Sequence, residues 1–247
     1  EFVNAGEFPD ARSLTLSPSG THVAILRGDR GLLLLPTGDV IAPRRAHEKT
    51  PSVAPIRIAD TSIHSVAFNP TGTHFATASE NGYACVYAMG SPEPSRCYLH
   101  KEQVRTIAWL SNGTEFVTAS LDGWVRIFTI DQDKPRIEFR HDEPVALAVP
   151  SLDGKRIVTL TVRKTARVWN AEDGTYKLSH SVHEGKFVSA AVSARNILLI
   201  YRTGASLFDL ELDNEKPLML AGGTVDTAEF SPDGDFIATL GRDGAAR

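Results

Sequence analysis

The stretch VRTIAWLSNGTEFVTASLDGWVRIF (residues 104–128) decides the fold, because it reads as three short strands joined by two tight turns. Apolar residues alternate along each strand, and Gly113 and the polar SLDG (120–123) stand at the turns. A period of two is typical of antiparallel strands, whereas no window of the chain keeps the period of a helix. The stretch therefore predicts short antiparallel strands.

The same pattern recurs along the whole chain. Its copies begin near residues 11, 63, 104, 145, 187 and 225, so most of them lie about 41 residues apart. A further strand-like run follows the copies at 54–59, 95–100, 135–141, 175–181 and 216–220. Each repeat is therefore predicted to contain four strands.

A four-stranded sheet of this size cannot bury both of its faces alone. Sheets that recur every 40 to 45 residues or so bury them by standing radially, as the blades of a β-propeller. A β-sandwich is the rival fold, but it gives no reason for one unit to recur with its turns in register. We therefore predict an all-β chain that forms one β-propeller over residues 1–247, with about six four-stranded antiparallel blades.

The ends of the chain leave two arrangements open. Residues 1–6 resemble the outer strand of a blade. If that strand joins the last repeat, a ring of six blades closes by sharing one sheet between both termini, which removes unpaired edges. If it belongs to a preceding blade, the chain is an excerpt of a seven-bladed or longer array.

Composition argues against several kinds of partner. A formal charge of -4 and a pI near 6.1 offer no basic field for nucleic acid. No apolar run approaches the roughly 20 residues that span a bilayer, so we expect no membrane role. Cys85 and Cys97 are expected to be two buried free thiols, although they could face each other in one hairpin. Free thiols favour a cytoplasmic location.

With these repeats the chain resembles the WD-repeat family. The family's Gly-His pair is represented by His100, His141 and His183, its Ser-x-Asp-Gly turn by residues 120–123, and its Trp-Asp pair by WN at 169–170. The glycine before each histidine is replaced, and no Trp-Asp dipeptide is intact. The period and the turns thus identify the fold, whereas the degenerate motifs identify no subfamily.

In that family the histidine, serine and aspartate bond to each other and to the tryptophan of the third strand. The resemblance therefore implies that His100, Ser120 and Asp122 form a structural hydrogen-bond set, with Phe128 in the place of the tryptophan. The same three residue types could suggest a hydrolase, but no nucleophile elbow surrounds Ser120. The histidines lack metal-ligand spacing. We expect no catalytic residue, no metal and no cofactor.

The resemblance also places partner binding on one rim of the ring, where the loops before the first strand and before the third strand meet. Trp124 begins a third strand there and is the best aromatic anchor. The charged candidates are a basic arc of Arg163, Lys164, Arg202 and Arg242 and an acidic counterpart of Glu80 and Glu102. Such an arc suits acidic or phosphorylated segments.

The sequence thus predicts a protein-protein interaction scaffold that binds proteins or peptides and performs no catalysis. One alternative stays open, a C-terminal sensor or autoinhibitory propeller of a larger signalling ATPase or kinase. The catalytic domain of such a protein would lie outside this chain.

Overall fold

The structure is a computed structural model in which β-strands are the regular elements. It describes residues 10–27, 31–37, 56–58, 63–163, 165–181, 187–193, 195–201, 204–209, 218–220, 225–231, 233–241 and 244–246. Within these ranges the strands form five four-stranded sheets and one two-stranded sheet, which we call blades 1 to 6 in chain order. The predicted all-β class is confirmed.

The blades have these bounds. Blade 1 contains β1 (Ala11–Leu16), β2 (His22–Arg27), β3 (Leu32–Pro36) and β4 (Ile56–Ile58), and blade 2 contains β5 (Ile63–Phe68), β6 (His74–Ser79), β7 (Tyr83–Ala88) and β8 (Arg96–Leu99). Blade 3 contains β9 (Val104–Trp109), β10 (Glu115–Ser120), β11 (Trp124–Thr129) and β12 (Ile137–Arg140), and blade 4 contains β13 (Val145–Pro150), β14 (Arg156–Thr161), β15 (Thr165–Asn170) and β16 (Tyr176–Ser181). Blade 5 contains β17 (Phe187–Val192), β18 (Asn196–Tyr201), β19 (Gly204–Asp209) and β20 (Leu218–Leu220), and the described part of blade 6 contains β21 (Val225–Phe230) and β22 (Ile237–Gly241).

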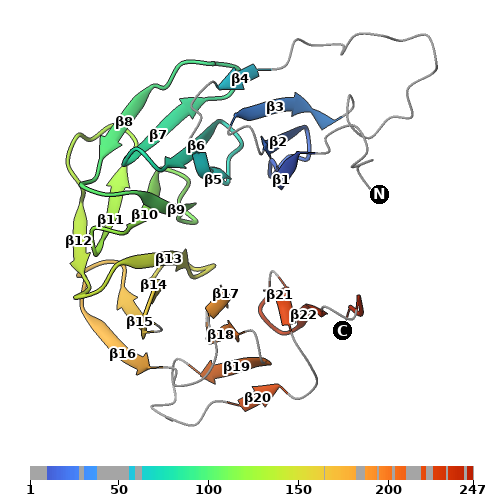
Figure 1. Ribbon diagram of the computed structural model, residues 1–247, viewed down its shortest axis with the longest axis vertical. Helices are drawn as coiled ribbons and strands as arrows, with labels where there is room; N and C mark the ends of the chain where they lie inside the picture. Colours follow the sequence, from blue (N-terminus) through green and yellow to red (C-terminus); the bar gives the residue numbers. More distant parts are fainter. Residues whose placement is uncertain are drawn as a thin grey trace.

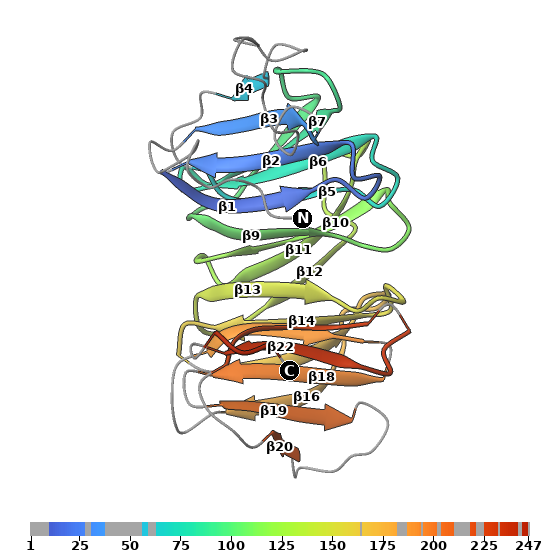
Figure 2. The same cartoon turned by 90° about the vertical axis from the view of Figure 1, so that its right-hand side faces the viewer.

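The blades follow one another around an arc, with first strands on the inner side and fourth strands on the outer side (Figure 1). A view turned by 90° shows β1, β9 and β13 one after another along the inner side (Figure 2). Within each of blades 1 to 5 the four strands pair in chain order. Four-stranded antiparallel blades are thereby confirmed. Residues 1–6 lie outside the described residues, so closure of the ring through them stays a prediction.

The core lies between consecutive blades. Phe116 and Phe128 of blade 3 pack with Tyr98 of blade 2 in one buried cluster. Phe139 of blade 3 stacks on Trp169 of blade 4, with ring centroids 4.9 Å apart. Burying a large apolar side chain contributes roughly 1.5–3 kcal/mol, so each blade is stabilised by its neighbours, as radial packing requires.

The two cysteines are joined rather than free. Cys85 of β7 lies directly opposite Cys97 of β8, with Cα atoms 4.1 Å apart, and the two form a disulfide. Cys85 is buried, whereas Cys97 is exposed. The prediction of two buried free thiols is therefore wrong, because antiparallel pairing brings both residues to one position of a hairpin. The cytoplasmic location stays a prediction and loses this support.

Candidate functional site

One edge of the arc gathers the loops that were expected to bind partners. In blade 3, β9 and β11 start at the same end of the sheet, because both are antiparallel to β10. The loops that precede them, 100–103 and 120–123, therefore meet there. We call this edge, formed by residues 80–82, 100–103, 120–124, 140–144 and 161–163, the rim.

The rim loops are tied to one another by backbone contacts. The backbone N–H of His141 donates to the carbonyl of Gly123 at 2.9 Å, and His100 donates to Gly82 in the same way at 2.9 Å. Gly123 has a φ of +83°, and a Cβ atom there would lie 2.9 Å from the carbonyl oxygen of His141. Only glycine fits this left-handed, crowded position, so each turn is locked against the loop that enters the next blade.

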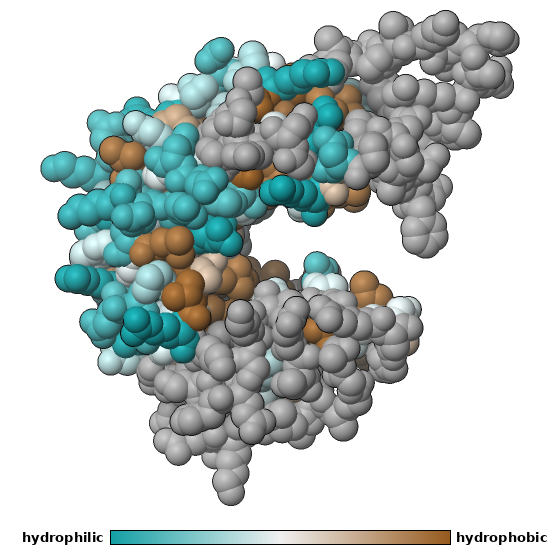
Figure 3. Space-filling view, in the orientation of Figure 1, coloured by the Kyte–Doolittle hydropathy of each residue, from teal (hydrophilic) through white to brown (hydrophobic). Residues whose placement is uncertain are grey.

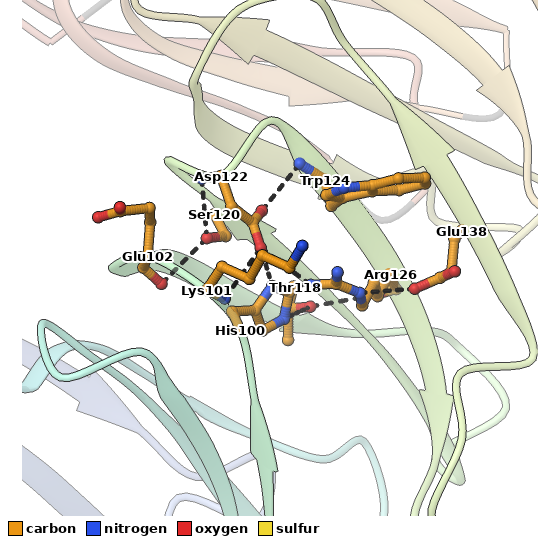
Figure 4. A network of polar contacts seen from close by, with 9 residues as sticks. All are labelled: His100, Lys101, Glu102, Thr118, Ser120, Asp122, Trp124, Arg126 and Glu138. Atoms are coloured by element: carbon orange, nitrogen blue, oxygen red, sulfur yellow. Dashed lines mark hydrogen bonds and ion pairs between the residues drawn. The ribbon is translucent and has the colours of Figure 1, made fainter.

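A buried histidine network lies under the rim of blade 3 (Figure 4). His100 Nε2 lies 2.9 Å from the hydroxyl of Thr118, which donates to the backbone carbonyl of Arg126 at 3.3 Å. The histidine must therefore donate to Thr118, which leaves its Nδ1 as an acceptor. Arg126 Nη1 contacts Nδ1 and also donates to Asp122 at 3.2 Å.

The charges of this network follow from burial and from these bonds. Burial lowers the pKa of His100, and the nearby Arg126 lowers it further, against an opposing effect of Asp122. Burial alone would raise the pKa of Asp122, but the adjacent His100 and hydrogen bonds from the backbone N–H groups of Trp124 and Lys101 hold it well below its usual range. At neutral pH a neutral histidine therefore sits beside an Asp122–Arg126 ion pair.

The hydrogen bonds of this network differ from those that the resemblance implied. Ser120 donates to the carbonyl of Glu102 at 3.1 Å and accepts from the backbone N–H of Asp122 at 3.2 Å. Thr118, not Ser120, bonds to the ring of His100. The set is thus His100, Thr118 and Asp122, and Ser120 instead holds the loops together. A hydrolase would need a serine beside the histidine, and these contacts do not form that pair.

Blade 4 repeats the histidine with a different partner. His141 Nε2 lies 2.8 Å from the hydroxyl of Thr159, and Trp169 Nε1 donates to the same hydroxyl at 2.8 Å. Burial, and then the charge of Arg167, lower the pKa of His141 to about 4. Arg163 stands where blade 3 has its aspartate, and its side chain is exposed.

Trp124 is half-buried, where an exposed indole was expected. The guanidinium groups of Arg126 and Arg140 each lie 5.6 Å from its ring centroid, an arrangement that we call the Trp124 stack. Arg126 also donates to Glu138 at 2.7 Å. Sequence reasoning missed Arg126 and Arg140, although both follow from strand geometry: one lies two residues along β11, and the other lies opposite Trp124 on β12.

The other rim candidates are only partly placed. Glu80 and Glu102 are exposed at the rim, and Gln103 donates to Glu80 at 3.4 Å across the boundary of blades 2 and 3. Lys164, Arg202 and Arg242 lie outside the described residues, so the basic arc stays a prediction. In the space-filling view the described part of one face of the arc is mostly hydrophilic, with hydrophobic atoms showing at several separate places (Figure 3).

In the part of the chain that the structure describes, His, Cys, Asp and Glu side chains form no group of three or more that could hold a metal ion. In the same ranges, no helix has the length and apolar character needed to cross a membrane.

Two stretches of the chain match a known family of repeats. The model described as WD domain, G-beta repeat, matches residues 55–87 and 93–129. Each match covers the outer strand of one blade and the first three strands of the next, that is, β4 to β7 and β8 to β11. A search of the curated proteins found no match. WD40 repeats generally mediate interactions between proteins. The matched repeats, and the same four-stranded unit recurring in the blades around them, support a WD-repeat family for this chain.

Proposed function

We propose that this chain is a scaffold that holds a partner protein or peptide on the rim of blades 2 to 4 and has no catalytic activity of its own. The observation that carries the proposal is the Trp124 stack, an aromatic ring at the rim with two guanidinium groups each 5.6 Å from its centroid. Tryptophan and arginine dominate the residues that contribute most to binding at protein interfaces.

The stack is supported from below, which favours binding. Asp122 accepts from the backbone N–H of Trp124 at 2.9 Å and also from Arg126, so the ring and one of its arginines are fixed before a partner arrives. A surface that is already ordered loses less conformational entropy on binding, so more of the contact energy remains as affinity.

The free charges at the rim suggest the chemistry of the partner. Arg126 is engaged by Asp122 and Glu138. Arg140 and Arg163 are exposed and form no ion pair with a described residue. Their guanidinium groups can each bind a carboxylate or phosphate through two parallel hydrogen bonds. An acidic or phosphorylated segment is therefore the proposed partner, in preference to nucleic acid or a membrane. The alternative role as a sensor module of a signalling ATPase or kinase has no observation in its favour.

A quantitative pull-down tests the proposal. The wild-type chain, Trp124→Ala and Arg140→Glu would be compared with Lys155→Glu, which changes an exposed charge on the turn between β13 and β14, away from the rim. We expect specific partners to be lost from both rim variants and kept by the control. Partners that bind all four proteins equally would place binding elsewhere.

A further inference from the structure

Each first strand carries a β-bulge at its second residue. In blade 3, Val104 lies opposite Ser120 and Thr106 lies opposite Ala119, so Arg105 has no opposite residue on β10. The same irregularity occurs in every blade, and the bulged residues in chain order are Arg12, His64, Arg105, Ala146, Val188 and Asp226. A bulge bends the strand and re-aims the side chain of the extra residue.

Three consecutive bulges present basic residues. Arg12, His64 and Arg105 occupy equivalent positions in blades 1 to 3, at the rim end of the innermost strands, whereas blade 4 has Ala146. Figure 1 shows β1, β5 and β9 as neighbours on the inner side of the arc. Arg12 and Arg105 are exposed, and neither forms an ion pair with a described residue. We call these three residues the inner mouth.

His64 has an unfilled hydrogen-bond position at the same place. Its Nε2 atom is buried and bonds to no described residue. Burial lowers the pKa of His64, the charges of Arg105 and Arg12 also lower it, and Glu80 and Gln103 raise it. A buried polar atom without a partner is costly, and an oxygen atom of a ligand would satisfy it.

We propose that Arg12, His64 and Arg105 form a binding site for the phosphate of a phosphorylated serine or threonine in the partner. The proposal rests on the proposed function, because it names one side chain of the same partner. A phosphate carries a charge of about -1.5 to -2 and has three acceptor oxygens, which matches two guanidinium groups and one imidazole N–H. A carboxylate has one charge and two oxygens, so it would match the two guanidinium groups and the imidazole less completely than a phosphate does.

Direct binding to defined probes tests the site. The probes are a fluorescein-labelled peptide pool with one fixed phosphoserine among random positions, and matched pools with serine or glutamate there. We expect the phosphoserine pool to bind, inorganic phosphate to compete, and Arg12→Gln and Arg105→Gln each to weaken binding by roughly tenfold, as loss of a charged hydrogen bond does. The matched control is Arg57→Gln, which removes an exposed charge from outer strand β4 of blade 1 and should leave binding unchanged.

A second readout follows the site itself. The imidazole resonances of His64 should move on addition of phosphoserine peptide in wild type and in Arg57→Gln, but not in the Arg12→Gln, Arg105→Gln double variant. Three results overturn the proposal: no saturable binding of the phosphoserine pool, equal binding of the glutamate pool, or equal weakening by Arg57→Gln.

The two proposals can fail separately. Partner capture that depends on Trp124, together with no phosphopeptide binding, removes the phosphate site and leaves the scaffold function. Phosphopeptide binding that depends on Arg12, together with partners indifferent to Trp124, supports the inner mouth and moves the remaining contacts away from the Trp124 stack.

Discussion

Blades 3 and 4 carry the same histidine–threonine pair but support it differently. His100 bonds to Thr118 at 2.9 Å, and His141 bonds to Thr159 at 2.8 Å. In blade 4 the hydroxyl of Thr159 also donates to a backbone carbonyl and accepts from Trp169, so its one donor and two acceptor positions are filled.

In blade 3 an ion pair beside the histidine takes the place of the hydrogen bond that the tryptophan makes in blade 4. Phe128 occupies the place of Trp169 and cannot donate to the threonine. Instead, Asp122 and Arg126 lie against the other side of the histidine ring. The difference teaches that one fold position can be stabilised either by a neutral hydrogen bond or by a buried ion pair. Only the ion pair also orders the Trp124 stack at the rim.

Removing the aspartate should have the largest effect on this comparison. Asp122→Ala leaves the largely buried Arg126 without one of its two carboxylates, and we expect the free energy of unfolding to fall by about 3 kcal/mol. Arg163→Ala, at the equivalent position of blade 4, should change it by less than about 0.5 kcal/mol because that side chain is exposed. Urea denaturation of both variants measures the difference. Equal losses would show that the ion pair is not what distinguishes the blades.

The disulfide of blade 2 should affect the His100 network of blade 3 more than the His141 network of blade 4. β8, which Cys97 links to β7, leads directly into His100, whereas the strand before His141 contains no cysteine. The bond closes a loop of about a dozen residues, and its loss from a Cys85→Ser, Cys97→Ser variant should cost roughly 2–3 kcal/mol. Hydrogen exchange should then rise more around His100 than around His141. Reduction of the wild type provides the control for the substitutions.

Acid should destabilise the fold through the buried histidine of blade 4. The pKa of His141 is about 4 in the folded chain and about 6.5 when unfolded, so between these values the unfolded chain binds more protons. Stability should therefore fall as the pH drops from 6.5 towards 4, by up to about 3 kcal/mol from this residue. Urea denaturation at stepped pH should show a smaller slope in His141→Gln. An unchanged slope would assign the protons to other groups.

Exchanging the indole should give the smallest effect. Trp169→Phe would make blade 4 resemble blade 3 by leaving the second acceptor position of Thr159 empty. We expect a loss of about 1 kcal/mol, the usual contribution of one hydrogen bond. The same urea titration measures it, with exchange of blade 4 amides as a local readout. A loss above about 3 kcal/mol would mean that ring packing on Phe139 dominates.

Part of the site followed from local pattern and part did not. The resemblance directed attention to His100 and Asp122, but it assigned Ser120 a contact that Thr118 makes. Both residues lie on β10 two positions apart, so both point to the same face, and only the packing of His100 against that face selects one. The partners of Trp124 required the register of β11 with β12.

The sequence by itself determined the all-β class and the four-stranded repeat. Alternating apolar residues and turn residues are local signals, and they recur about every 41 residues. The tertiary structure alone decided which side chains meet across neighbouring strands and blades. The Cys85–Cys97 bond, the Trp124 stack and the bulged Arg12, His64 and Arg105 all depend on register, and a shift of one residue would turn each side chain to the other face.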